Sequence, residues 1–495
     1  MRLALAATIG LSVDESYAAV MARRLSLSYL DHPPMVFWWA GLATRLAGSE
    51  SPMVMRLPYI AAFAVTTWLL YRLGDLLFDA PAGLWTAFLL NVSLFLSVCA
   101  GGWALPDGPL LLFSVGAAYC LARAMIHDGP SPSPGPSGSA VKGETSWWVG
   151  FGVCAGLALL SKYHGVFLLA GAGLYIVTSG RRAACLRRPG PYLAVALAAV
   201  IFLPVITWNA THEWASFRFQ GGRAVPIEET GGTAFLDSVL GQAAWTLPWI
   251  WIPLLLALAA ALRAGPHDSR RWLLVCLGSG PILAFTLLTA FDIHGLPHWE
   301  APGYFMALPL LGAWVAHDRR TRSRTGPWLA ACAMGFLLVV LGLATHARTG
   351  WLGRAAPSVF ARGDPTHDLM DWTPVAQQVR AWGFPIPGII IAAPRWDDAA
   401  KIAYAMGPSV DVTCVGEDPR GFAYTRSPRA NLDKDFLLVV RRRAGREPLV
   451  AYAAYFDALQ WLENVPLVRN GREEVTVSLY LGHRLRGPLP LLQQR

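Results

Sequence analysis

Charged residues are scarce in this sequence. Asp, Glu, Lys and Arg make up 15% of the 495 residues, whereas hydrophobic residues make up 54%. This balance excludes an ordinary water-soluble globule, and several apolar runs approach the ~20 residues that cross a bilayer. The sequence therefore predicts a polytopic α-helical membrane protein.

Disulfide and nucleotide-binding patterns are missing. The seven cysteines form no CxxC pair, and most lie inside apolar runs, so we interpret them as small buried residues. No Gly-rich phosphate loop is present, which argues against a nucleotide cofactor. The net charge of +9 comes mainly from arginines in short loops. We attribute it to the positive-inside bias and not to nucleic-acid binding.

Apolar runs predict about eleven transmembrane helices. Residues 1–11 are too short to span a bilayer and have no small-residue cleavage site, so we interpret them as the remainder of a truncated first helix. The other ten spans are expected at 54–74, 82–100, 108–126, 147–161, 165–179, 191–208, 240–262, 272–290, 301–316 and 327–346.

The distribution of Lys and Arg sets the expected orientation. Arginine clusters at 181–188, 263–271 and 319–324 occupy alternate loops, which are expected to face the cytoplasm. The Pro-, Ser- and Gly-rich segment 129–146 belongs to the same side and is expected to be a disordered linker. The opposite loops hold the polar clusters, and the region after Thr345 falls on this non-cytoplasmic side.

The chain changes character after the last span. Residues 1–346 are expected to form the transmembrane domain, and 347–495 an α/β domain outside the membrane that is large enough for its own core. Within that domain, helices are expected at 373–382, 397–406 and 455–464, and strands at 388–393, 436–441 and 474–481.

Ionisable residues gather on the predicted outer face. Asp14 and Glu15 follow the first apolar stretch, Asp107 begins one span and Lys162 ends another. Taken singly, Asp14 and Asp107 are typical helix caps, and Lys162 is typical of a snorkelling anchor. Taken together at one depth, carboxylates and a lysine suit a general base and a phosphate clamp.

Two histidines complete the candidate site. His32 follows Asp31 in an Asp-His-Pro-Pro stretch whose prolines fix the backbone. His298 stands beside a tryptophan, and read alone it belongs to the interfacial aromatic belt. Asp31 and His298, with Glu300 or His294, are candidate ligands for a divalent metal ion, although no sequence spacing supports such a site.

Six motifs in this order resemble the bacterial branch of glycosyltransferase family 39. Its members are GT-C-fold enzymes related to protein O-mannosyltransferases and to the lipid A aminoarabinose and galacturonic acid transferases. The resemblance covers about residues 10–320 and, more weakly, the tail. The motifs are Asp-Glu (14–15), Asp-His-Pro-Pro (31–34), Pro-Asp-Gly-Pro (106–109), Leu-Ser-Lys-Tyr (160–163), Trp-Asn-Ala-Thr-His-Glu-Trp-Ala-Ser-Phe (208–217) and Pro-His-Trp-Glu-Ala-Pro (297–302).

The resemblance implies inverting transfer of a sugar from a polyprenyl-phosphate donor to a lipid, lipopolysaccharide or protein acceptor. It implies that Asp14 and Glu15 are catalytic, with Asp14 as the base, and that Asp31 lies near a metal ion and the acceptor phosphate. The lipid A branch often has lysine where this chain has His32, so phosphate binding is expected to fall to Lys162.

The departing phosphate needs positive charge, and the isoprenoid needs an apolar groove. Lys162, with Arg218 or Arg223, would supply the charge, and the spans would supply the groove. The expected substrate-binding residues are Asp31, His32, Asp107, Lys162, Tyr163, Arg218 and His298.

Two other classes of protein remain open at this stage. A transporter or flippase would also bury ionisable groups, but near mid-membrane and in paired halves, and the sequence has no internal repeat. An interaction protein would not need Asp14, Glu15, Asp107 and Lys162 on one face.

Overall fold

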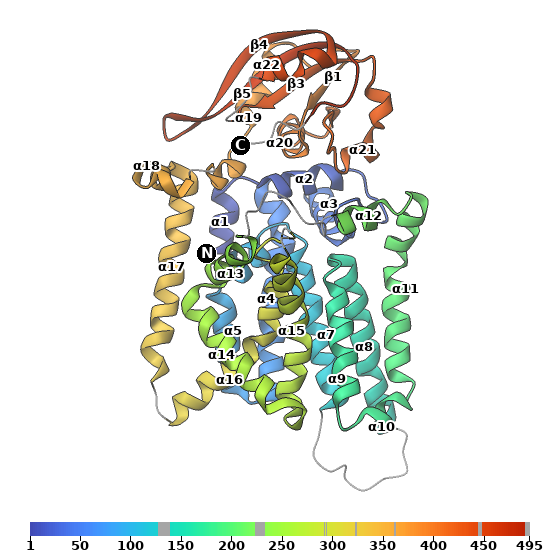
Figure 1. Cartoon of the computed structure of the whole chain (residues 1–495), viewed down its shortest axis with the longest axis vertical. Helices are drawn as coiled ribbons and strands as arrows, with labels where there is room; N and C mark the ends of the chain where they lie inside the picture. The colour runs from blue at the N-terminus through green and yellow to red at the C-terminus, as the bar shows by residue number, and fades with distance from the viewer. Residues whose placement is uncertain are drawn as a thin grey trace.

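The computed structural model describes the whole chain except residues 127–138, 223–232, 292, 294, 322–323, 361–362, 444–447 and 491–495. A bundle of long helices forms one part, and a domain built on a β-sheet covers one end of it (Figure 1). Long helices such as α4, α7, α8, α11 and α15 run along the longest axis of the molecule.

The bundle contains long helices joined by short ones. Its helices are α1 (Arg2–Thr8), α2 (Val13–Ala22), α3 (Met35–Ala47), α4 (Pro52–Leu77), α5 (Ala80–Asn91), the π-helix η1 (Phe95–Cys99), α6 (Ala100–Gly102), α7 (Asp107–Met125), α8 (Ser139–Ser161), α9 (Gly165–Thr178), α10 (Arg182–Leu186), α11 (Gly190–Thr211), α12 (Ala215–Gly222), α13 (Ala234–Thr246), α14 (Pro248–Ala264), the 3₁₀ turn η2 (Gly265–His267), α15 (Ser269–Ala290), α16 (Ala301–Thr321) and α17 (Thr325–Thr349).

Six helices within the described residues are long and apolar enough to cross a membrane: α4, α7, α11, α14 with η2, α15 and α17. Two bent pairs, α1 with α2 and α5 with η1 and α6, raise the number to eight if each pair is one span. The eleven spans predicted from the sequence are therefore not confirmed.

Two of the predicted spans are interrupted by breaks in the helix. The run 82–100 bends by 85° after Asn91, where the Arg2 guanidinium donates to Asn91 Oδ1 at 3.0 Å and to Ser97 Oγ at 2.8 Å. The run 240–262 breaks at Leu247, whose φ is 76°, because the following Pro248 disfavours helical backbone in the residue before it. Average hydropathy over a window does not detect either break.

The predicted linker 129–146 is only partly a linker. Helix α8 already begins at Ser139, so the end of that segment is helical. The stretch up to residue 138 lies outside the described residues.

The sheet domain holds a five-stranded mixed sheet of order β2-β1-β3-β5-β4. Strand β1 pairs in parallel with β2 and β3, whereas β5 is antiparallel to β3 and β4. Helices α19 and α20 pack on one face of the sheet and α22 on the other. The elements are α18 (Trp351–Ala355), the 3₁₀ turns η3 (Pro357–Phe360) and η4 (Pro365–Leu369), α19 (Thr373–Ala381), β1 (Ile389–Ala393), α20 (Trp396–Met406), β2 (Val412–Cys414), α21 (Phe422–Thr425), the 3₁₀ turn η5 (Pro428–Asn431), β3 (Asp435–Arg441), α22 (Pro448–Tyr452), the 3₁₀ turn η6 (Ala453–Tyr455), β4 (Phe456–Arg469) and β5 (Arg472–Leu485).

One helix predicted in this domain is wrong. Residues 455–464 belong mostly to β4, which pairs along its length with β5 through a tight turn at Asn470 and Gly471. Both turn residues have positive φ, 52° and 75°, as an Asn-Gly hairpin requires. Pairing with β5 therefore overrides the local helical pattern of the segment.

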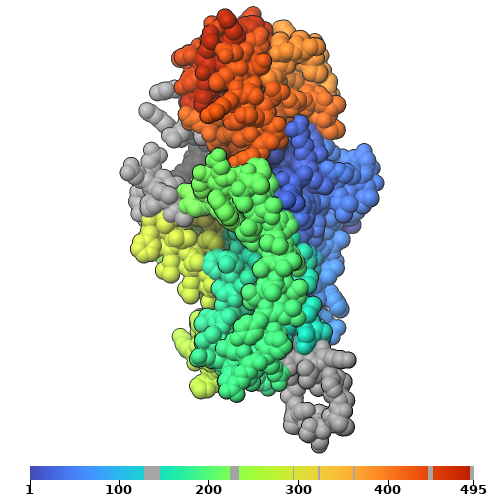
Figure 2. All heavy atoms as spheres, turned by 90° about the vertical axis from the view of Figure 1, so that its right-hand side faces the viewer, coloured from blue at the N-terminus to red at the C-terminus, as the bar shows by residue number. Residues whose placement is uncertain are grey.

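The two parts of the molecule share a hydrophobic core. Tyr17 and Ala18 of α2 belong to the same buried cluster as Ala399 and Ala400 of α20 and Phe422 of α21. Figure 2 shows the sheet domain resting on the N-terminal segment and on the region that follows α11. The sheet domain is therefore packed against the bundle and not tethered loosely to it.

Candidate active site

A cavity of about 590 Å³ lies where the bundle meets the sheet domain. Its polar lining comes from both parts of the chain. From the bundle come Asp14, Tyr17, Asp31, His32, Asp107, Lys162, Tyr163, His164, Gln220 and His298, and from the sheet domain come Trp396 and Arg420. Seven of the nine residues predicted to act in the site thus line one cavity, and Glu15 and Arg218 do not.

The carboxylate oxygens of Glu15 are fully engaged in hydrogen bonds within the protein. Its carboxylate accepts from the Ser12 backbone N–H at 3.0 Å and from that of Ala104 at 3.0 Å. The first contact belongs to a capping box that starts α2, in which the Ser12 side chain accepts from the Glu15 backbone N–H. Glu15 is fully buried, so its position suits an anchor and not a group that meets substrate.

Arg56 is the main partner of Glu15. Its Nε and Nη2 donate to the two carboxylate oxygens at 2.7 and 2.6 Å, and its remaining donors reach the carbonyl oxygens of Ile9 and Gly10. Burial raises the pKa of Glu15, but the Arg56 charge and hydrogen bonds outweigh it and lower the pKa overall. The pair thus ties the start of α2 to α4 and keeps Glu15 ionised.

Asp14, the neighbouring residue, has the opposite environment. It is exposed to the cavity that it lines, although protein surrounds it closely. Burial, followed by the negative charge of Asp31, raises the pKa of Asp14 to about 6, and Arg420 opposes the shift. A carboxylate with a pKa near neutral suits a general base.

Tyr17 links Asp31 to the sheet domain. Its hydroxyl donates to Asp31 Oδ1 at 2.9 Å and accepts from the Gly421 backbone N–H at 2.9 Å. Gln220 Nε2 donates to the Asp31 carbonyl oxygen at 2.5 Å. A side chain at Gly421 would collide with the Tyr17 hydroxyl, so glycine is needed for this close approach.

Asp107 and Lys162 form a buried ion pair. Lys162 Nζ lies 2.9 Å from Asp107 Oδ1, and the two side chains are 6% and 5% exposed. The structure brings together the first residue of α7 and the residue that follows α8, as the sequence predicted from their common depth. Both His32 and His298 lie within electrostatic range of Asp107.

The remaining predicted residues differ in placement. Tyr163 forms a hydrogen bond with Ser216 Oγ at 2.6 Å, and the His298 ring stacks on Phe95 with 5.1 Å between centroids. Arg218 lies outside the cavity, because its side chain is 65% exposed and pairs with the equally superficial Glu213. Prediction of Arg218 as a substrate-binding residue is therefore not supported by its position.

The other candidates from the same motifs contribute little. Glu300 is buried and accepts from Gln242 at 3.1 Å without lining the cavity. His294 and Arg223 lie outside the described residues.

The expected metal ligands do not form a complete set. Asp31 and His298 line the same cavity, but Asp31 Oδ1 already accepts the Tyr17 hydroxyl. No group of three ligating His, Cys, Asp or Glu atoms includes either residue in the part of the chain that the structure describes. These residues alone therefore do not define a metal site.

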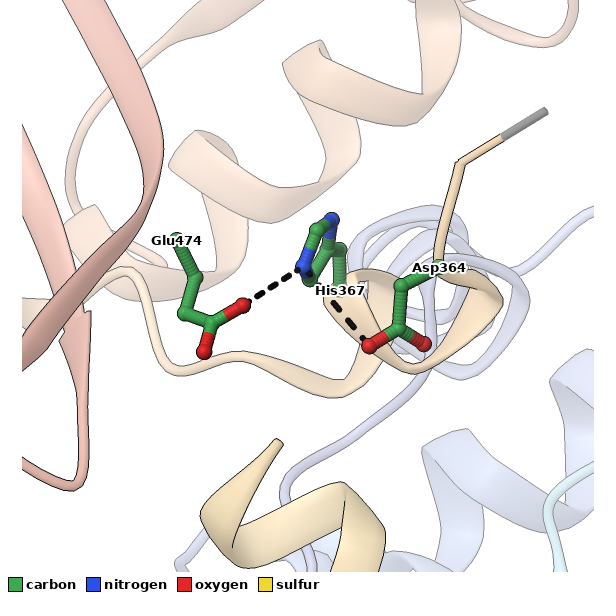
Figure 3. Close-up of side chains that lie close together, drawn as sticks. All are labelled: Asp364, His367 and Glu474. Carbon is green, nitrogen blue, oxygen red and sulfur yellow. Dashed lines mark hydrogen bonds and ion pairs between the residues drawn. The ribbon is translucent and has the colours of Figure 1, made fainter. Parts of the chain in front are cut away.

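A different acidic cluster lies in the sheet domain (Figure 3). Ligand atoms of Asp364, His367 and Glu474 lie within 4.8 Å of one another. Arg469 Nη2 already bridges the two carboxylates, at 2.8 Å from Asp364 and 3.1 Å from Glu474. Burial alone would raise the pKa of Asp364, but hydrogen bonds from Thr366 and Arg469 hold it at about 2. We interpret the cluster as an ion-pair network in which the guanidinium balances the carboxylates.

Sequence reasoning missed several residues at or behind the cavity, among them Tyr17, Arg56, Gln220, Trp396 and Arg420. Arg56 carried a signal, since it is a charge at the start of the predicted span 54–74, where a buried partner is expected. Trp396 and Arg420 carried none, because only the docking of the sheet domain brings them to the cavity.

Comparison with known proteins gives matches over the bundle. The family model described as dolichyl-phosphate-mannose-protein mannosyltransferase matches residues 31–208. Lipid A galacturonosyltransferase RgtD of Rhizobium johnstonii is 26% identical over 319 residues, a stretch that covers 62% of this chain and 60% of the relative.

The whole architecture matches a solved structure. ArnT from Cupriavidus metallidurans is 18% identical, with a TM-score of 0.62 in the apo state over 95% of this chain and 93% of that one. Its complex with undecaprenyl phosphate gives a TM-score of 0.63 over 97% and 95%. At this identity the match shows the fold alone.

Fold and cavity together define a membrane protein of the GT-C type, with a helical bundle covered by a sheet domain and a polar cavity between them. Within that class, the chain is similar to the dolichyl-phosphate-mannose-protein mannosyltransferases over residues 31–208 and to the lipid A galacturonosyltransferase RgtD over 319 residues.

Proposed function

We propose that this protein is a glycosyltransferase that moves a sugar from a polyprenyl-phosphate donor to an acceptor hydroxyl, with inversion at the anomeric carbon. The observation that carries the proposal is Asp14, a carboxylate that faces a cavity at one end of the bundle and has a pKa of about 6. The similarity to the mannosyltransferase family model and to RgtD supports the same reaction class.

Asp14 would act as the general base. In the proposed step, Asp14 accepts the proton of the acceptor hydroxyl, and that oxygen forms a bond to the anomeric carbon from the face opposite the phosphate. The bond between the anomeric carbon and the phosphate oxygen breaks, and its electron pair leaves with the polyprenyl phosphate. One proton and one sugar are thus transferred, and no oxidant or nucleotide is needed.

Positive charge for the leaving group would come from Lys162. Its side chain lines the cavity, where it is held by Asp107 at 2.9 Å. Holding the lysine in a fixed position avoids reorganisation when negative charge develops on the departing oxygen. His32 and Tyr163 line the same wall and would orient the phosphate.

The acceptor is proposed to be a lipid, a lipopolysaccharide or a protein, with lipid A favoured. The relative RgtD is described as a lipid A galacturonosyltransferase, which supports an acceptor of that class. A divalent ion near Asp31 and His298 stays a prediction, and no step of the proposed reaction depends on it.

The cavity and the sheet domain are proposed to face the periplasm or cell exterior, with the chain in the bacterial inner membrane. Arg181, Arg187 and Arg188 support this orientation, because they lie around α10 at the end opposite the sheet domain (Figure 1). Transport is not favoured, since the polar cavity lies at one end of the bundle and the relatives are transferases.

Replacement of Asp14 by asparagine tests the proposal. Membranes that contain the purified variant, a radiolabelled polyprenyl-phosphate sugar and lipid A should show transfer reduced at least ~100-fold, the range typical of loss of a general base. Asp411→Asn, which changes an exposed carboxylate paired with Arg426, is the matched control and should transfer normally. Undiminished transfer by Asp14→Asn would refute the assigned role.

A further inference from the structure

Arg420 is the contribution of the sheet domain to the charge of the cavity. It lies between β2 and α21, and it lines the cavity together with Trp396 of α20. Among the described Lys and Arg residues, only Lys162 and Arg420 line the cavity. Arg420 lies close enough to Asp14 and Tyr17 to affect both electrostatically.

The Arg420 side chain is held by aromatic rings and not by a buried acid. Its guanidinium carbon lies 4.4 Å from the centre of the Trp396 ring and 5.0 Å from that of Phe219. Contacts of this kind fix the plane of a guanidinium and leave its edge for hydrogen bonds. Trp396 comes from the sheet domain and Phe219 from α12 of the bundle, so the position exists only when the two parts are docked.

Arg420 retains unused donors, in contrast to the other cations near the site. Arg56 and Lys162 each bind a buried carboxylate, at 2.6 and 2.9 Å. Arg420 donates through Nε to Asp418 at 3.1 Å, and the side chain of Asp418 is 39% exposed. No other hydrogen bond from Arg420 to a described residue is present, so four of the about five N–H donors of a guanidinium remain.

The backbone at Arg420 is also unusual. Its φ is 49°, in the left-handed region that is unfavourable for a non-glycine residue. The neighbouring Gly421 N–H binds the Tyr17 hydroxyl, which holds this turn against α2. The turn is thus fixed against α2, and Arg420 is its cavity-lining side chain.

We infer that Arg420 is a specificity-determining residue that binds an oxyanion of the substrate beside the reacting carbon. Two sources present this chemistry: the carboxylate of a transferred uronic acid and the donor phosphate. A planar guanidinium binds either of them through two parallel hydrogen bonds. The inference rests on the proposed function, because Asp14 marks the place of the reacting carbon.

Two donors distinguish the sources. Wild-type protein and Arg420→Gln are compared in membranes with a polyprenyl-phosphate uronic acid and with the neutral hexose of the same configuration. If Arg420 binds the sugar carboxylate, the variant loses kcat/KM for the uronic acid by about 10- to 100-fold, the size expected for one hydrogen bond to a charged group, and changes little with the hexose. If it binds the phosphate, both donors lose equally.

Arg420→Lys and Arg426→Gln complete the design. Lysine keeps the charge without the paired hydrogen bonds, so it should recover only part of the lost activity. Arg426, on the surface of the same domain, is the matched control and should behave as wild type. Intrinsic tryptophan fluorescence during thermal unfolding verifies that each variant is folded.

The outcomes separate this inference from the proposed function. Wild-type kinetics for folded Arg420→Gln with both donors would overturn the inference while leaving glycosyl transfer intact. Absence of transfer by the wild-type protein with either donor, in membranes where a known transferase works, would instead count against the proposed function.

Discussion

Arg56 and Glu15 form a two-point ion pair that fixes the first turn of α2, with nitrogen–oxygen distances of 2.7 and 2.6 Å. The side chains are 1% and 0% exposed. This pair sets the direction in which the next residue toward the N-terminus, Asp14, faces the cavity. Of the two neighbouring carboxylates, one therefore holds the structure and the other is available to substrate.

Replacement of Glu15 by glutamine should lower activity by lowering the stability of the folded protein. Removal of one charge leaves the Arg56 guanidinium buried without compensation, and breaking a buried pair costs about 3–5 kcal/mol. We expect a lower midpoint of thermal unfolding and lower activity in proportion to the folded fraction. A folded Glu15→Gln protein with normal stability and no activity would instead support direct catalysis by Glu15.

Activity should depend on the ionisation of Asp14. Because its pKa is raised to about 6, the base is mostly protonated below that pH, and kcat/KM should rise tenfold per pH unit below 6 and level off above it. Measurement of kcat/KM for the donor as a function of pH, with wild-type protein and a saturating concentration of acceptor, tests this prediction. A profile that is flat from pH 4.5 to 7.5 would contradict the assignment.

The same shift gives a stability prediction of opposite sign. A carboxyl whose pKa is higher in the folded than in the unfolded state favours folding when protonated, and this contribution is lost as the pH rises through about 6. Asp14→Asn should therefore unfold at the same temperature as the wild type or above it at pH 7.5, although it is inactive. Differential scanning fluorimetry in detergent tests this, and marked destabilisation would assign Asp14 a structural role.

Lys162 and Asp107 should behave as a coupled pair. Lys162→Met leaves Asp107 buried and unpaired, which we expect to cost about 3–5 kcal/mol as well as transfer activity. The double variant Lys162→Met, Asp107→Leu removes both charges, so it should recover stability but not activity. Recovery of transfer by the double variant would exclude Lys162 from phosphate binding.

Metal dependence tests the roles of Asp31 and His298. If the two side chains hold a divalent ion with substrate oxygens, chelation by EDTA should abolish transfer, and addition of a divalent salt should restore it. His298→Ala would then require more added metal for half-maximal activity. Full activity after exhaustive chelation would leave these residues as direct substrate contacts only.

The helical part of the site was largely predictable from the sequence. Asp14, Asp107 and Lys162 lie at the ends of apolar runs. Because a membrane holds such ends at the same depth, the sequence predicts that the three side chains lie at one level of the bundle. The resemblance gave Asp14 as the base but also assigned a catalytic role to Glu15, because the ion pair of Glu15 with Arg56 cannot be inferred from the sequence alone.

Other features depended on contacts between distant segments. The break after Asn91 needs Arg2, which lies 89 positions away, and the strand at 456–469 needs β5 as its partner. Trp396 and Arg420 reach the cavity only because α20 shares a core with α2. These features depend on partners that are distant in the sequence, so they cannot be predicted from any short stretch of it.

Arg420 stands on a short turn of the sheet domain, whereas Asp14 and Lys162 belong to the bundle. The proposed reaction and the recognition of its substrate are thus encoded in stretches of the gene some 250 codons or more apart. If Arg420 binds the carboxylate of the sugar, exchange of the turn 415–421 between related proteins would alter the choice of sugar and leave the base unchanged. This division of the chain allows the substrate to change while the chemistry stays constant.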